Sequence, residues 1–242
     1  MGGHPAGHEG VSDDGEREGE DEDPRDCPHH QHEYGKSRGV KPGRAQVTAL
    51  DPEFVVPQDG HEKQDCESVA AQRWLSAVGS RYAELGITLV GDDIFGTQGY
   101  IEELVQQDIQ YILVAKPGSH KYLYEELHSF EQLGQLRVMQ RTRWTGKQRL
   151  SYTYRYFNGV GLKDGEQAPK VNWVELTITT PQGKIQLHMS FITSYLISDA
   201  NVESLVGAGR CRWKIENEDF NTLKTKGYHF EHNFGHGKRF LS

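Results

Sequence analysis

The sequence predicts an α/β protein in which a parallel sheet is followed by an antiparallel β segment. Over residues 61–133, short apolar runs alternate with stretches of helical periodicity, an order typical of parallel strands joined by helices. Over residues 136–197, apolar and polar residues alternate with period two between turn signals, which indicates antiparallel strands. The length of 242 residues is enough for one large domain.

Each expected element follows from its local pattern. Helical spacing of apolar residues predicts helices, in chain order, over residues 61–85, 97–109, 121–133 and 200–226. Two short apolar runs at 87–90 and 111–115 are expected to form buried strands between the first three helices. The strands expected in the antiparallel segment are 136–144, 150–157, 171–179 and 185–197.

Residues 1–46 differ from the rest and are expected to form a disordered, acidic and His-rich tail. They are rich in Gly, Asp, Glu, His and Pro and bury too little apolar surface to offset the entropy of ordering. Ten acids and two bases in residues 1–27 account for the formal net charge of −8, so the remaining chain is balanced. The tail is either a solvated terminus or an interaction segment. The short spacing of Cys27, His29, His30 and His32 leaves zinc binding as an alternative to a disordered cluster.

Basic residues are concentrated in the antiparallel segment, where residues 132–161 contain no acid. Trp144 and several tyrosines are interleaved with these bases, a mixture that suits phosphate contact and base stacking. The alternative is a hairpin whose aromatic residues face a core and whose bases face water. The residues expected to contact DNA are Arg141, Arg143, Lys147 and Arg149.

Two carboxylates are the candidates for chemistry. Asp92 follows the expected strand at 87–90, and functional side chains gather at the carboxyl ends of such strands. Glu216 lies on the expected last helix, where Arg212, four residues earlier, shares its face and Lys224 continues the row. The competing interpretations are a turn cap for Asp92 and a solvated salt-bridged stripe for Glu216.

The two motifs together resemble those of insertion-sequence DDE transposases, in the branch with a β-rich insertion before the catalytic Glu. The stretch Leu89-Val90-Gly91-Asp92-Asp93-Ile94-Phe95 resembles the second-Asp motif of that family, and Gly209-Arg210-Cys211-Arg212-Trp213-Lys214-Ile215-Glu216 resembles its Arg-Trp-x-Ile-Glu motif. The resemblance covers about residues 50–242. It implies an incomplete RNase H-like core over 47–242, with an antiparallel β insertion at about 134–198 and a C-terminal catalytic helix.

The resemblance also implies a chemistry and its partners. Catalysis would be a two-metal phosphoryl transfer with Mg²⁺ held by Asp92 and Glu216, supported by Arg212 and Lys224. The expected partner is DNA at transposon ends, with a homodimer as a candidate assembly. The mean hydropathy of −0.72 and the short apolar runs argue against a membrane span. Three widely spaced cysteines, Cys27, Cys66 and Cys211, argue against a disulfide framework and lead us to expect a cytoplasmic protein.

One departure from the family pattern bears on activity. The first catalytic Asp of the family lies on an early strand, and no such strand is evident in this sequence. Asp14, Asp51 and Asp59 are the candidates to replace it. The neighbours of Asp14 do not favour a strand, whereas Asp51 follows the apolar, extended run at 47–50 and ranks above Asp59 as a stand-in. We therefore predict a chain that is catalytically defective by itself. The alternative is a non-enzymatic DNA- or protein-binding remnant with an acidic tail.

Overall fold

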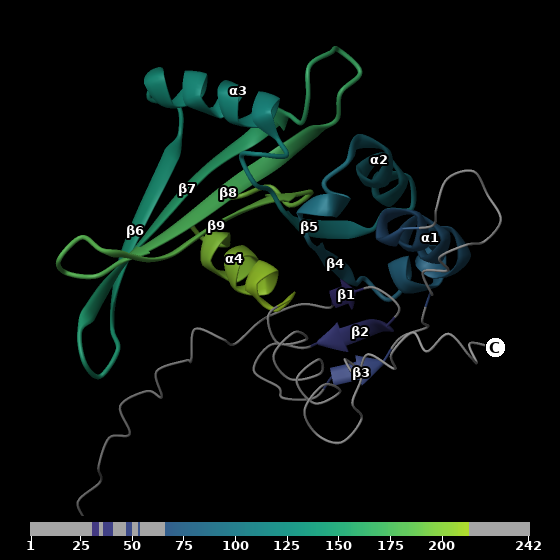
Figure 1. Cartoon of the computed structure of the whole chain (residues 1–242), viewed down its shortest axis with the longest axis horizontal. Helices are drawn as coiled ribbons and strands as arrows, with labels where there is room; N and C mark the ends of the chain where they lie inside the picture. Colours follow the sequence, from purple (N-terminus) through teal and green to yellow (C-terminus); the bar gives the residue numbers. More distant parts are fainter. Residues whose placement is uncertain (1–30, 34–35, 41–46, 50–52, 54–65, 213–242) are drawn as a thin grey trace, which may run out of the picture.

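The computed structural model describes residues 31–33, 36–40, 47–49, 53 and 66–212 (Figure 1). Within these residues, no helix combines the length and the apolar character that crossing a membrane requires.

A six-stranded sheet forms the centre of the described structure, in the order β4-β5-β9-β8-β7-β6. Its strands are β4 (Thr88–Gly91), β5 (Gln110–Val114), β6 (Arg137–Trp144), β7 (Arg149–Gly161), β8 (Lys170–Thr179) and β9 (Ile185–Thr193). β4 and β5 pair in parallel, and all other neighbours are antiparallel. The expected α/β class is therefore confirmed. Because β9 pairs with β5, the antiparallel segment extends the parallel sheet instead of forming a separate one.

Three short strands form a second sheet in the order β1-β2-β3, namely β1 (Gln31–Glu33), β2 (Lys36–Val40) and β3 (Val47–Ala49). β1 lies beside β4, at the free edge of the larger sheet (Figure 1). β1 and β2 precede residue 47, so backbone pairing begins inside the segment that we expected to be a tail.

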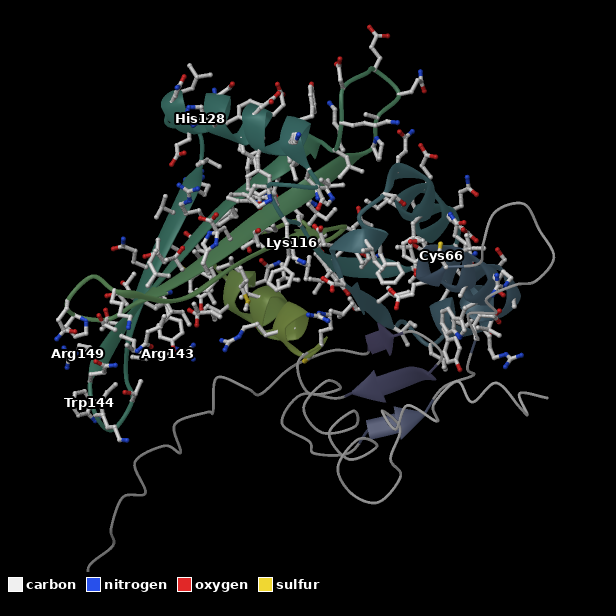
Figure 2. All side chains as sticks on the ribbon, in the orientation of Figure 1. Cys66, Lys116, His128, Arg143, Trp144 and Arg149 are labelled. Atoms are coloured by element: carbon white, nitrogen blue, oxygen red, sulfur yellow. The ribbon has the colours of Figure 1, made fainter. Side chains whose placement is uncertain are left out.

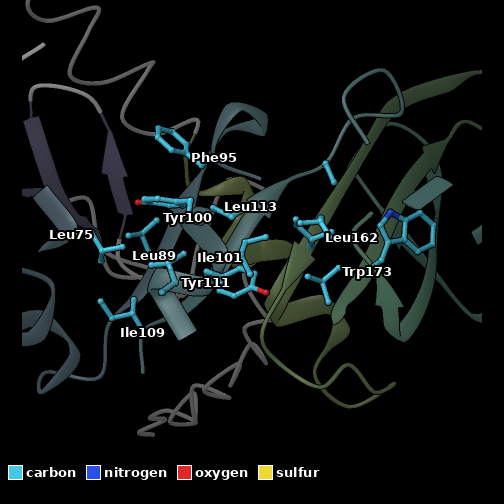
Figure 3. Packing of buried hydrophobic residues seen from close by; sticks show 14 of the residues in the cluster. Leu75, Leu89, Phe95, Tyr100, Ile101, Ile109, Tyr111, Leu113, Leu162 and Trp173 are labelled. Carbon is cyan, nitrogen blue, oxygen red and sulfur yellow. The ribbon is translucent and has the colours of Figure 1, made fainter. Parts of the chain in front are cut away.

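Helices cover both faces of the six-stranded sheet. The helices are α1 (Glu67–Ala83), α2 (Gln98–Gln106), α3 (Lys121–Gln132) and α4 (Val202–Arg210), with a 3₁₀ turn, η1 (Asp93–Phe95), after β4. On β4 and β5, Leu89 and Tyr111 pack with residues of α1 and α2 (Figure 3), whereas Val90 and Ile112 pack with residues of α4. Because successive side chains of a strand point to opposite faces of the sheet, a separate hydrophobic core forms on each face. The expected continuation of the last helix to residue 226 lies outside the described residues.

β6 and β7 form a hairpin at one edge of the sheet, where β7 pairs with β8 from Ser151 to Gly161. We call residues 137–155 the basic hairpin, and Arg143, Trp144 and Arg149 gather at its free end (Figure 2). Tyr152, Tyr154 and Tyr156 on β7 are all buried, as their period-two spacing predicts. β6 forms the outer edge, and among its residues only Met139 is buried.

Candidate active site at the carboxyl end of β4

Asp92 lies where the two parallel strands of the sheet end. β4 ends at Gly91 and β5 at Val114, so the turns that follow them meet at the same edge. Asp92 caps the η1 turn, and its Oδ1 accepts a hydrogen bond of 2.8 Å from the backbone N–H of Asp93. The capping role that we set against catalysis is therefore present, but it uses only one of the carboxylate oxygens.

Two cations face Asp92 from different elements. The Nζ atom of Lys116, which follows β5, lies 3.9 Å from Asp92 Oδ1. The Nη1 atom of Arg212, which follows α4, lies 3.7 Å from Asp92 Oδ2. The Arg212 side chain is 13% exposed and the Lys116 side chain 62% exposed, while Asp92 keeps 34% exposure. Asp92 is thus a solvent-accessible carboxylate between a largely buried cation and an exposed one.

Packing of α4 brings Arg212 to this position. Val202, Val206 and Ala208 are fully buried against the sheet, and Gly209 lies directly on the ring of Phe191. An added Cβ at Gly209 would lie only 2.7 Å from a Phe191 ring carbon, so the close approach of helix and sheet requires glycine at this position.

The neighbouring Asp93 is used differently. Its side chain is 10% exposed and accepts a 2.7 Å hydrogen bond from the backbone N–H of Lys116, together with one from the Ser119 hydroxyl. Nδ1 of His120 lies 3.4 Å from the same carboxylate. Because these contacts occupy both oxygens of Asp93, Asp92 is the carboxylate of this pair that remains open to a ligand.

A further carboxylate lies near Asp92 on the first turn of α1. Partial desolvation raises the pKa of the Glu67 carboxyl, and the negative charge of Asp92 raises it further. Glu67 was not a candidate from the sequence.

Carboxylate oxygens are the donors that Mg²⁺ prefers, and Asp92 offers them in an accessible place. In the part of the chain that the structure describes, no three His, Cys, Asp or Glu side chains form a group suited to holding a metal. The chemistry of the donors fits Mg²⁺, and their number among the described residues falls short of a two-metal site.

The basic hairpin contacts the helix that leads to this site. Arg141 Nε lies 3.1 Å from Glu203 Oε1, and Arg143 Nη2 lies 2.5 Å from Glu203 Oε2. Arg143 also lies over the ring of Tyr152, at 5.3 Å from its centroid. Partial burial lowers the pKa of Arg143, but the hydrogen bond and charge of Glu203 outweigh this and raise it overall.

The remaining bases of the hairpin have other surroundings. Lys147 and Arg149 are exposed at its free end, next to Trp144, which is 55% exposed (Figure 2). Arg155 faces the other side of β7 and pairs with Glu131 and Glu175. Of the four bases expected to contact DNA, two are therefore engaged by Glu203 and two are presented to solvent.

Several predicted site residues lie outside the described residues. They are Glu216, Lys224, Asp14, Asp51 and Asp59, together with the side chains of the Cys27 to His32 cluster. The shared helical face of Arg212 and Glu216 and the roles of these residues stay predictions.

Sequence reasoning missed Lys116, although a signal was present. Lys116 directly follows the expected strand at 111–115, and functional side chains gather at the carboxyl end of that strand as they do at the end of the strand before Asp92. Asp93 and His120 carried no such signal, because their contact spans 27 residues.

Comparison with known proteins identifies the family. The family model described as "Transposase DDE domain" matches residues 19–241, nearly the whole chain. None of the curated proteins matches this chain. The mixed α/β structure of the described residues, with a six-stranded sheet and four α-helices, is consistent with an RNase H-like transposase domain. The chain therefore belongs to the family of transposases with a DDE domain.

Proposed function

We propose that this transposase domain is built for metal-dependent phosphoryl transfer on DNA at transposon ends, and that Asp92 and Glu216 are its metal ligands. The observation that carries the proposal is the placement of Asp92 at the carboxyl end of β4, facing Arg212 at 3.7 Å, within the family match. Mg²⁺ bound there would activate a water or hydroxyl and stabilise the leaving oxygen. The proposal places this activity in the cytoplasm.

The residues of the chain have separate tasks in this proposal. Arg212, largely buried, holds the Asp92 carboxylate in place. Lys224 supports Glu216 or the DNA. Arg141, Arg143, Lys147 and Arg149 of the basic hairpin contact the DNA backbone, and their charge makes the binding depend on salt concentration.

We also propose that this chain does not cleave DNA by itself. β1 is the strand beside β4, and its residues Gln31-His32-Glu33 contain no aspartate. We take β1 as the counterpart of the early strand on which the family carries its first catalytic Asp, and its lack of an aspartate supports a defective site. Two carboxylates can hold a metal only weakly compared with three.

The test is calorimetric titration with Mn²⁺, on the chain and on an Asp92→Ala/Glu216→Ala double variant. We expect weak binding to the chain and its loss in the double variant. Asp164→Ala, an exposed acid on the turn after β7, serves as the control and should bind as the unaltered chain does. No binding to the unaltered chain would refute the metal site.

A nicking assay on supercoiled DNA tests the defect. With Mg²⁺ or Mn²⁺, we expect no conversion to the open circle. Conversion that disappears in Asp92→Ala would show that the chain is an active enzyme and would overturn the proposed defect. DNA binding by the unaltered chain together with no binding of Mn²⁺ would favour the non-enzymatic remnant instead. Sedimentation velocity with and without DNA would test the homodimer.

A further inference from the structure

A polar network ties together the two turns that border Asp92. Asp93, on the turn after β4, accepts hydrogen bonds from the backbone N–H of Lys116 at 2.7 Å and from the hydroxyl of Ser119. His120, on the same turn as Lys116 and Ser119, places Nδ1 3.4 Å from Asp93 Oδ1. One carboxylate thus contacts three residues of the turn that follows β5.

His120 also contacts the end of η1 through its other ring nitrogen. It is only 6% exposed, and its Nε2 lies 3.0 Å from the carbonyl oxygen of Gly96, at the end of η1. A Cβ at Gly96 would lie 2.5 Å from His120 Nε2, so the contact requires glycine there. Buried polar groups with several partners fix the relative position of the elements that carry them. We call Asp93, Ser119 and His120 the turn latch.

The latch fixes the backbone of Lys116 and leaves its side chain in solvent. The carbonyl oxygen of Lys116 also accepts hydrogen bonds from the N–H groups of Ser119, at 3.2 Å, and His120, at 3.1 Å. The Lys116 side chain is 62% exposed, and its Nζ is 3.9 Å from Asp92 Oδ1. An exposed ion pair at this distance contributes little to stability, so stability does not explain the placement of the ammonium group.

Phosphate is the ligand that this arrangement suits. Arg212 already faces the other oxygen of Asp92 and is largely buried, so the exposed ammonium of Lys116 is the cation that an incoming anion meets first. A lysine on a fixed turn, next to an accessible carboxylate, can neutralise a phosphate that approaches that carboxylate.

We propose that Lys116 binds a DNA backbone phosphate beside Asp92, and that Asp93 is a positioning residue which, through the turn latch, holds Lys116 there. This inference rests on the proposed function, because it takes DNA as the ligand. The phosphate contact of Lys116 lies beside Asp92 and is additional to the DNA contacts proposed for the basic hairpin.

The test measures how DNA binding depends on salt. Binding of the full chain to a 30-base-pair duplex of random sequence, labelled for fluorescence anisotropy, is followed over a series of NaCl concentrations. For Lys116→Gln we expect affinity to fall about threefold to tenfold at low salt and the slope of log K against log salt to shrink by about one. Lys116→Arg should restore both. Lys163→Gln, an exposed lysine on the turn after β7, is the matched control and should change neither.

The role of Asp93 is tested by a double-variant cycle. Asp93→Asn should lower DNA affinity when Lys116 is present and cause no further loss in Lys116→Gln, because it acts through that lysine. Hydrogen exchange at residues 116–120 should increase in Asp93→Asn while the rest of the domain stays protected, which distinguishes local loosening from unfolding. Losses that add independently would overturn the positioning role.

The outcomes separate this inference from the proposed function. If the unaltered chain binds the duplex and Lys116→Gln keeps the full affinity and slope, the phosphate contact is wrong and the proposed function stands. If the unaltered chain does not bind the duplex at all, both fail.

Discussion

Glu203 is the residue on which the DNA-binding surface depends most directly. It pairs with Arg141 and Arg143, two of the four bases expected to contact DNA. A phosphate must therefore compete with this carboxylate for both guanidinium groups. We predict that Glu203→Gln raises the affinity for a short duplex about threefold at low salt, because it removes this competition and a nearby negative charge.

The same variant should lose less than about 1 kcal/mol of unfolding free energy, since both ion pairs are partly exposed. The affinity is read from anisotropy titrations, with Glu166→Gln, an exposed acid on the turn after β7, as the control. Weaker binding by Glu203→Gln would contradict the prediction and would mean that Glu203 orients the arginines for DNA.

Two helical glycines test how the elements pack. Gly209 on α4 has ring atoms of Phe191 at 2.7, 2.8 and 3.0 Å from the position of an added Cβ, and Phe191 is 1% exposed. Gly99 on α2 has nothing within 4 Å. Gly209→Ala should therefore destabilise the domain by about 1–3 kcal/mol through overpacking. Gly99→Ala should stabilise it by up to about 1 kcal/mol, because alanine is the better helix former.

Urea unfolding followed by circular dichroism measures both changes. The opposite signs are the informative result, since the substitution is the same in both helices. A Gly209→Ala variant as stable as the unaltered chain would show that α4 does not pack closely against the sheet. Because that packing places Arg212 beside Asp92, the result would also contradict the position of Arg212.

Elements that depend on local pattern could be predicted, and those that depend on distant contacts could not. The alternation of Tyr152, Tyr154 and Tyr156 predicted that they share one face of β7, because strand geometry alone decides it, and their burial agrees with the alternative in which the aromatic residues face a core. The helix over 121–133 was placed within one residue of its observed end. By contrast, the antiparallel pairing of β9 with β5 joins segments about 80 residues apart, and period-two alternation carries no information on partners.

In the candidate site, too, the features set by local sequence could be predicted and those set by distant contacts could not. Asp92 was found because its position after a buried strand is a local feature. The Glu203 pairs with the basic hairpin were missed, because they join residues about 60 positions apart. The sequence also did not show that Asp93 is engaged by the turn after β5 while Asp92 stays accessible. The two residues are identical and adjacent, so only the contacts that the fold gives them distinguish their roles.

At the scale of the whole molecule, the charge is unevenly distributed along the chain. The formal net charge is −8, and the acids of residues 1–27 account for the excess, while residues 132–161 contain no acid. A net negative charge repels DNA over distances of about a Debye length, roughly 10 Å at 0.1 M salt. The acidic segment should therefore weaken DNA binding that the basic hairpin favours.

We test this with the full chain by changing five acids to their amides. The acids Glu9, Asp13, Asp14, Glu16 and Glu18 precede the family match, which begins at residue 19, and the change takes the formal net charge from −8 to −3. We predict that the variant binds a 30-base-pair duplex about twofold to fivefold more tightly at about 0.05 M NaCl, and that the gain disappears near 0.5 M because salt screens the repulsion.

A second variant separates net charge from the position of the acids. It carries five amide substitutions on the described surface, at Glu84, Glu102, Asp108, Asp164 and Glu166, all exposed. It has the same net charge of −3. If long-range repulsion by net charge is the cause, both variants gain alike, whereas a gain confined to the first means that residues 9–18 compete with DNA locally. Unchanged binding by the first variant at low salt would show that the acids of residues 9–18 have no part in DNA binding, neither through net charge nor through local competition.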